Sequence, residues 1–310
     1  MSGAKSAGAG DNTEPIYLYH LFMYPAKVLL FGEYLVLLGV RALTLPLERF
    51  GGEWAWNSAE DGLQEELRAF AHSEAIAGIP ALDVRAFRQE VAQGLFFRSN
   101  IPRGYGLGSS GALCAAVYDR YATTKTDDLI VLKQLFARME AFFHGRSSGI
   151  DPLTSYVRRP LLVRGQEDVR FFEQQPWHGP TPAVFLFDTG QERQTGPLVQ
   201  WFVEQCRHRD FAARIEDELL PTHEALIEAW QTGASAQLWP LLRRLSAFQL
   251  QHWQPMIPEQ WRPLWAELMA SDEVLFKICG AGGGGFLLLF GRTAESVQRL
   301  LGHYAPIRIL

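Results

Sequence analysis

A glycine-rich segment at residues 101–112, IPRGYGLGSSGA, constrains the fold of this chain more than any other stretch. Glycines at alternating positions are costly inside a helix or a strand, so the segment must form a loop. The alanine-rich apolar run that follows predicts a helix. Such a loop delivers backbone N–H groups to a helix N-terminus, where the helix dipole favours an anion such as phosphate. The alternative is an ordinary Gly/Ser turn that caps a helix.

A second segment, residues 140–151 (EAFFHGRSSGID), carries two carboxylates. Apolar residues recur upstream of it at helical spacing, and Thr126–Asp128 offers N-cap chemistry, so Glu140 is predicted near the end of a helix. Asp151 follows a Ser-Ser-Gly turn that can aim its side chain into a cleft. The alternatives are a solvated helix carboxylate for Glu140 and an N-cap role for Asp151.

A third segment, residues 277–285 (KICGAGGGG), places five glycines in six positions before the apolar run FLLLF. This composition predicts a tight loop between two strands. A flexible linker is excluded, since linkers are polar and lead out of a domain.

Together with residues 25–34 (PAKVLLFGEY), these segments resemble the ordered motifs of the GHMP kinase superfamily, over a span from Pro25 to Phe290. Within the superfamily the chain is most similar to mevalonate kinases, in which a Mg²⁺-binding Glu is followed at this spacing by His-Gly, Ser-Gly and a catalytic Asp. The resemblance implies an α+β fold with an N-terminal domain like ribosomal protein S5 domain 2 and a ferredoxin-like C-terminal domain. A Walker-type P-loop does not fit, because Gly-Lys-Ser/Thr is missing from residues 101–112.

The same resemblance implies a reaction and its residues. The chain would transfer the γ-phosphoryl group of ATP to the hydroxyl of mevalonate, in isoprenoid precursor synthesis. Asp151 would act as the base, with Lys27 paired to it; the alternative for Lys27 is a surface lysine at a strand edge. Ser110 and Glu140 would bind Mg²⁺. The ATP phosphates would contact Pro102, Gly104, Gly106, Leu107, Gly108, Ser109, Ser110 and Gly111, and the acceptor would contact Glu33, Tyr34, Thr195, Gly280, Ala281 and Gly282.

Two departures bear on the acceptor. Tyr34 stands where mevalonate kinases usually carry a histidine that helps to hold the substrate, so its phenol is expected to donate a hydrogen bond to the acceptor. Gly111 replaces the more usual alanine. Both departures favour phosphomevalonate kinases of the same superfamily, whereas the His144-to-Asp151 segment favours mevalonate kinases. Residues 188–195 (DTGQERQT) resemble a substrate-side loop of both groups. The motifs are also compatible with a sugar or homoserine kinase and with a catalytically silent ATP-binding regulator.

Length and composition are compatible with the kinase that the resemblance implies. The chain has 310 residues, of which 47% are hydrophobic, and its net charge of −5 argues against nonspecific nucleic-acid binding. No stretch is long and apolar enough to span a membrane. Three widely spaced cysteines favour a reducing cytoplasm and offer neither a disulfide framework nor a zinc site. The tryptophans of the second half predict core packing, and an exposed subset of them could form a homodimer face: Trp230, Trp239, Trp253, Trp261 and Trp265.

Changes of hydrophobic period predict the organisation of the chain. Residues 1–14 are small and polar and are expected to be a disordered tail, followed by an ATP-binding domain over 15–176 and a second domain over 177–310. Strands are expected at 16–22, 27–31, 35–38, 54–56, 95–100, 161–164, 169–172, 183–187 and 307–310, and helices at 62–76, 83–92, 112–122, 198–231, 234–252 and 293–304. The mixture indicates an α+β protein.

Overall fold

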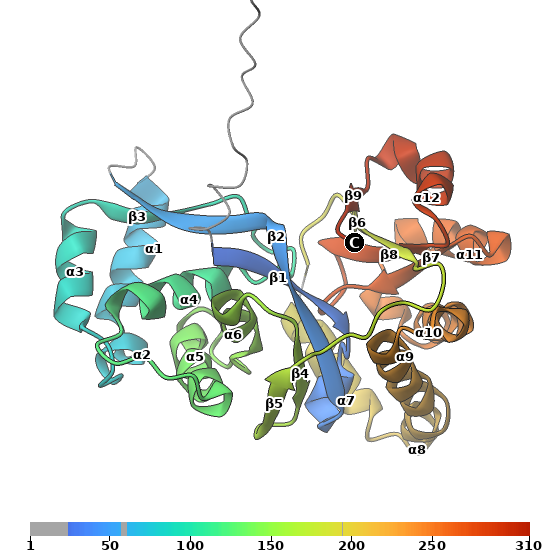
Figure 1. Cartoon of the computed structure of the whole chain (residues 1–310), viewed down its shortest axis with the longest axis horizontal. Coiled ribbons are helices and arrows are strands. Elements are labelled where there is room, and N and C mark those ends of the chain that lie inside the picture. Colours follow the sequence, from blue (N-terminus) through green and yellow to red (C-terminus); the bar gives the residue numbers. More distant parts are fainter. Residues whose placement is uncertain (1–23, 57–60, 194) are drawn as a thin grey trace, which may run out of the picture.

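The computed structural model describes residues 24–56, 61–193 and 195–310. The predicted tail at 1–14 and the predicted strand at 16–22 lie outside these residues. Within them, helices and strands alternate irregularly along the chain and build two separate antiparallel sheets (Figure 1). The α+β prediction is confirmed.

The first sheet is built around β2 (Arg41–Trp56), a 16-residue strand that pairs with three others. Its N-terminal half lies between β1 (Tyr24–Phe31) and β4 (Leu161–Arg164), and its C-terminal half pairs with β3 (Leu95–Ser99). β5 (Asp168–Phe171) extends the sheet beyond β4. In β1, six of the eight residues are buried, so both faces of this strand are covered.

Helices of the first half gather on one face of this sheet (Figure 1). α4 is enclosed by its neighbours, and nine of its 13 residues are buried, most of them small or apolar. Asp128 accepts hydrogen bonds from two backbone N–H groups at the start of α5, as the N-cap prediction requires. The helices are α1 (Asp61–His72), α2 (Glu74–Ala77), α3 (Val84–Ala92), α4 (Ser109–Tyr121), α5 (Leu129–His144) and α6 (Ile150–Val157).

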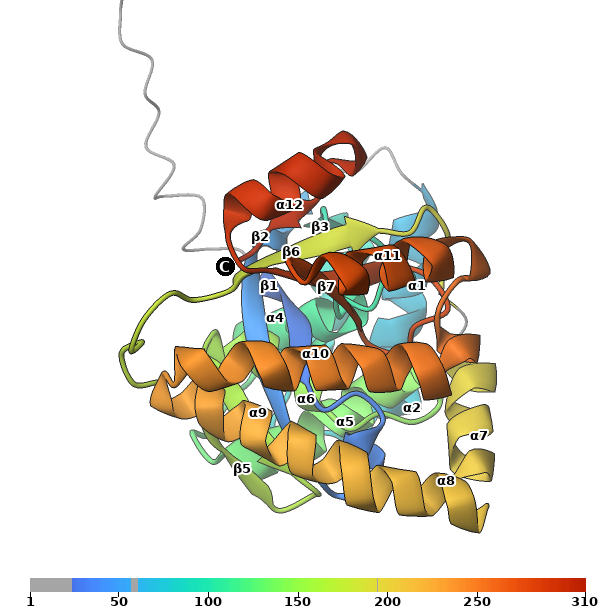
Figure 2. The same cartoon turned by 90° about the vertical axis from the view of Figure 1, so that its right-hand side faces the viewer.

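The second sheet has the strand order β7-β8-β6-β9, and helices cover it. Figure 2 shows α9 and α10 running side by side, below β6 and β7 in that view. The strands are β6 (Ala183–Asp188), β7 (Val274–Ile278), β8 (Phe286–Gly291) and β9 (Ile307–Arg308). The helices are α7 (Thr195–Gln205), α8 (Arg209–Arg214), α9 (Leu220–Thr232), α10 (Ser235–His252), α11 (Arg262–Ser271) and α12 (Ala294–Leu301), with a π turn at Ile215–Leu219 between α8 and α9.

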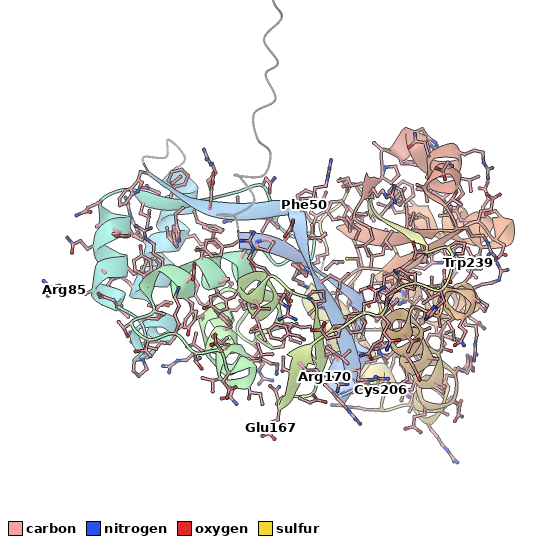
Figure 3. The ribbon with its side chains drawn as sticks, viewed as in Figure 1. Phe50, Arg85, Glu167, Arg170, Cys206 and Trp239 are labelled. Atoms are coloured by element: carbon pink, nitrogen blue, oxygen red, sulfur yellow. The ribbon has the colours of Figure 1, made fainter. Side chains whose placement is uncertain are left out.

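One hydrophobic core spans the two halves, and a second lies within the first half. Phe31 of β1 stacks on Phe290 of β8, with ring centroids 6.2 Å apart, and Phe50 of β2 lies 6.4 Å from Phe286. Side chains fill the space between the sheets, with Phe50 labelled at the junction in Figure 3. The chain leaves the first sheet at β5 and enters the second at β6, on either side of residue 177. Packing across this junction holds the two sheets in a fixed position relative to each other.

Two expectations from the sequence are wrong. Leu35–Leu38 forms a 3₁₀ turn, η1, because the chain reverses between a positive φ at Tyr34 (63°) and a left-handed Gly39. The tryptophans expected to supply an exposed homodimer face are instead inside the protein: Trp230, Trp239, Trp253 and Trp265 are buried and Trp261 is partly buried. Their predicted role in core packing is confirmed. Across the described ranges, each helix is too short or too polar to cross a bilayer.

Candidate active site

A cavity of about 540 Å³ lies where the glycine-rich loop before α4, residues 101–108, meets α4, α5 and α6. We call residues 101–108 the first glycine loop. Its volume falls in the range of small-molecule sites, roughly 300–1,000 Å³. One group of lining residues is polar and includes Ser110, His144, Asp151 and Arg193. The other is largely apolar: Leu67, Phe97, Ile101, Leu113 and Phe143.

The first glycine loop and the start of α4 form a wall of this cavity. Gly108 is the N-cap of α4 with a φ of 74°, and Lys27 N–H donates to the carbonyl of Leu107, which ties the loop to β1. The first-turn amides of a helix have no intrahelical acceptor, so they are available to an anion. Seven of the eight residues expected to contact phosphates line the cavity: Pro102, Gly104, Gly106, Leu107, Gly108, Ser109 and Ser110.

The eighth residue, Gly111, has a different role. A Cβ at Gly111 would come within 2.9 Å of the Asp151 Cβ and 2.8 Å of the Pro152 nitrogen. Glycine at this position therefore lets α4 approach α6 closely. That approach brings Asp151 beside the glycine loop.

Asp151 and Lys27 form an ion pair at the cavity, as the sequence predicts. The Lys27 Nζ lies 3.0 Å from Asp151 Oδ1, and the two side chains are 8% and 29% exposed. Lys27 comes from the middle of β1, whereas Asp151 is the second residue of α6 and not its N-cap, which is Gly149. A buried cation therefore faces a carboxylate that remains accessible from the cavity.

Ser110 and Glu140 also lie together. The Ser110 hydroxyl is 3.1 Å from Glu140 Oε1, and Ser147 donates a hydrogen bond to the other carboxylate oxygen. Glu140 is 4% exposed and thus is not a solvated helix residue. Burial, followed by the nearby charge of Asp151, raises the pKa of Glu140 to about 7. A cation bound here would favour the ionised carboxylate.

His144 completes this cluster, although its sequence position indicated no specific role. Its Nε2 lies 2.9 Å from the Ser110 hydroxyl. Burial and the positive charge of Arg193 lower the pKa of His144. The imidazole is therefore neutral at pH 7 and offers Ser110 one hydrogen bond.

Arg193 also lines the cavity, from the loop after β6. Its backbone N–H donates to the carbonyl of Gly104, and its guanidinium is next to Gly106 and Gly280. The loop thus places a cation on the cavity that also contains Asp151. The sequence marked residues 188–195 only as a loop, because an isolated arginine has no periodic signature. The side chain of Thr195, which was expected to contact the acceptor, lies outside the described part of the chain.

Glu33 and Tyr34 do not face the cavity, which corrects the expectation that they contact an acceptor. Glu33 is buried and forms an ion pair with Lys277. Tyr34 is also buried, and its hydroxyl donates to the carbonyl of Ala281. Both side chains contact the second glycine loop, residues 279–285, and not the cavity. That loop, with Gly280, Ala281 and Gly282, is not among the residues that line the cavity, but Gly280 lies next to two residues that are, Arg193 and Gly106.

The geometry has the components of phosphoryl transfer. It combines a helix N-terminus for phosphate, a carboxylate with a lysine beside it, and two further oxygen donors on Ser110 and Glu140. In the described residues, no group of three or more His, Cys, Asp or Glu side chains could hold a metal. A metal ion at Ser110 and Glu140 would need further oxygen ligands from a bound phosphate or water.

Comparison with known families gives one match: the profile of the GHMP kinases N terminal domain matches residues 74–158. This segment includes the first glycine loop, α4, α5 and α6 together with Asp151. No curated protein matches the sequence.

Several solved kinase structures share the fold over nearly the whole chain. L. major mevalonate kinase in complex with R-mevalonate superposes with a TM-score of 0.66 at 16% identity, covering 92% of this chain and 94% of its own. Streptococcus pneumoniae phosphomevalonate kinase in complex with phosphomevalonate and AMPPNP gives 0.62 at 17% identity, covering 92% and 98%. Lactococcus lactis galactokinase complexed with galactose gives 0.60 at 14% identity, covering 91% and 88%.

Proposed function

We propose that this chain is a member of the GHMP kinase superfamily and an ATP-dependent kinase that phosphorylates the hydroxyl group of mevalonate. The observation that carries the proposal is the Lys27–Asp151 pair beside the N-terminus of α4. It places a proton acceptor and a phosphate cradle on one cavity. The similarity to mevalonate kinase in both motif order and fold supports the choice of acceptor.

The reaction requires one bond to form and one to break. The acceptor oxygen attacks the γ-phosphorus of ATP, the bond from that phosphorus to the β-phosphate oxygen breaks, and ADP leaves. Asp151 accepts the hydroxyl proton, and Lys27 stabilises the carboxylate and the charge that develops on the transferred phosphoryl group. The first-turn amides of α4 hold the phosphates in line with the acceptor.

Mg²⁺ fits the Ser110–Glu140 pair, since it prefers hard oxygen ligands and usually combines one or two carboxylates with substrate phosphates. When bound, it would neutralise phosphate charge. Ser147 and His144 orient the two ligands through hydrogen bonds to Glu140 and Ser110.

The two groups of cavity residues suit the two ends of ATP. The apolar side chains of Leu67, Phe97 and Phe143 would receive the purine base, and the glycine loop would receive the triphosphate. Arg193, on the same cavity as Asp151, would bind the carboxylate of mevalonate. This assignment replaces Glu33 and Tyr34 as the proposed acceptor contacts.

Acceptor-dependent ADP release tests the kinase proposal. Purified protein with Mg²⁺ and ATP should release ADP rapidly when mevalonate is added and slowly without it. A silent ATP-binding regulator would bind ATP yet release ADP at the same background rate with mevalonate, 5-phosphomevalonate, galactose and homoserine. That uniform result would reject the enzymatic proposal.

The metal assignment predicts a graded response to substitution. Ser110→Ala and Glu140→Gln should each raise the Mg²⁺ concentration for half-maximal rate by about tenfold or more, because each removes an oxygen ligand or its charge. Ser109→Ala is the matched control and should change it by less than about threefold. Mg²⁺ titrations of the initial rate measure all three, and equal effects of the two serine variants would contradict the assignment.

A further inference from the structure

The buried ion pair between Glu33 and Lys277 has no part in the proposed chemistry. Glu33 follows β1 in the first half of the chain, and Lys277 lies on β7 of the second sheet. Their side chains are 1% and 2% exposed. Burying two charges costs several kcal/mol per ion, so such a pair contributes little net stability compared with an apolar pair of the same volume. The presence of this buried ion pair is therefore better explained by a role other than stability.

Both charged groups lie against the backbone where β7 ends and the second glycine loop begins. Lys277 Nζ donates to the carbonyl of Ile278, the last residue of β7, at 2.8 Å. The backbone of Gly280 is close enough to Glu33 to favour the ionised form of that carboxylate and so to lower its pKa, although burial raises the pKa overall. These contacts hold the chain where it leaves β7.

Tyr34 adds an independent attachment to the same loop. Its hydroxyl donates to the carbonyl of Ala281, and its ring packs against Phe202 and Trp253, with centroids 4.9 and 5.4 Å away. The φ of Tyr34 is 63°, a conformation that costs a non-glycine residue about 1–3 kcal/mol. The surrounding structure holds this backbone so that the side chain reaches the loop.

The fixed loop in turn supports Arg193. A Cβ at Gly280 would lie 3.0 Å from the Arg193 guanidinium, so the bare backbone of Gly280 packs directly against that group. Further along the loop, the N–H of Gly285 donates to the carbonyl of Gln191 at 2.6 Å, and Gln191 Nε2 donates to the carbonyl of Gly283. Hydrogen bonds therefore tie the second glycine loop to the 188–193 loop.

We propose that Glu33, Tyr34 and Lys277 form an interdomain clamp that positions Arg193 at the cavity by holding the second glycine loop. The three are positioning residues that act through Gly280 and Ala281 on Arg193. The link to acceptor binding rests on the proposed function, whereas the mechanical link between clamp and loops does not.

Hydrogen–deuterium exchange tests the mechanical link without any substrate. The double variant Glu33→Gln/Lys277→Met keeps the buried volume and removes both charges, and it should speed amide exchange in peptides covering 279–285 and 188–193 by about tenfold, about 1.4 kcal/mol. Tyr34→Phe removes a single hydrogen bond and should speed exchange at 281–283 by about fivefold. It keeps the proposal testable if the double variant does not fold.

The Arg41–Glu224 pair supplies the matched control. It also joins the two halves, from β2 to α9, but touches neither glycine loop. Arg41→Met/Glu224→Gln should leave exchange at 279–285 and 188–193 within about twofold of wild type. Unchanged exchange in both the double variant and Tyr34→Phe, or an equal increase in the control, would overturn the clamp.

A double-mutant cycle tests the connection to Arg193. The double variant should raise KM for mevalonate by about tenfold with kcat within about threefold, and it should have no further effect in an Arg193→Met background. Full additivity in the two backgrounds would show that the clamp does not act through Arg193. If no acceptor is phosphorylated, the proposed function fails, and the exchange experiment still decides the mechanical part.

Discussion

Asp151→Asn should lower kcat by about 10²–10⁴-fold, the usual contribution of a positioned proton acceptor. The substitution is isosteric, so Lys27 and Gly111 can keep their contacts with residue 151 and the phosphate cradle stays intact. Affinity for ATP, measured by calorimetry, should therefore remain within about threefold of wild type.

Asp168→Asn on β5 is the control for this loss of one aspartate, since Asp168 is exposed and lies away from the cavity residues. Its kcat should match that of the wild type. If Asp151→Asn kept more than about a tenth of the wild-type kcat, Asp151 would not be the base.

Arg193→Met should raise KM for mevalonate by about 10–100-fold, the effect of losing a charged hydrogen bond of about 1.5–3 kcal/mol. KM for ATP should change by less than about threefold, because the α4 amides and Ser110 remain in place. Steady-state kinetics with each substrate varied in turn measure both constants.

The same substitution at Arg103 separates a specific effect from a general loss of positive charge. Arg103 also lines the cavity but is paired with Glu66 at 2.6 Å. Arg103→Met should leave KM for mevalonate within about threefold. Equal increases for Arg193→Met and Arg103→Met would indicate that the acceptor responds to net charge and not to Arg193.

The sequence predicted the parts of the site that lie on regular elements or glycine loops. Lys27 falls in an apolar run that predicts a strand, and Glu140 falls at the end of a periodic helix, so both could be placed before the structure was known. The Lys27–Asp151 pair is confirmed. The proposed roles of these residues in catalysis and metal binding remain predictions.

Side chains on irregular backbone could not be placed from the sequence. Glu33 and Tyr34 follow Gly32, whose φ of 117° turns the chain, and no period indicates which way their side chains point afterwards. The apolar run at Leu35–Leu38 is equally suited to a strand or a short helix. The structure has a short helix there, which ends at Gly39 in the left-handed conformation. Arg193 and His144 acquire their significance from neighbours distant in sequence, Gly280 and Ser110.

The choice of acceptor is tested most directly by competition. With mevalonate and 5-phosphomevalonate at equal starting concentration, ATP and Mg²⁺ should give a net rise in the ³¹P NMR signal of 5-phosphomevalonate that is faster than the appearance of the diphosphate. The value of kcat/KM should be larger for mevalonate than for its phosphate, galactose or homoserine. A diphosphate product formed faster than the monophosphate, or a larger kcat/KM for either of the other alcohols, would contradict the mevalonate proposal.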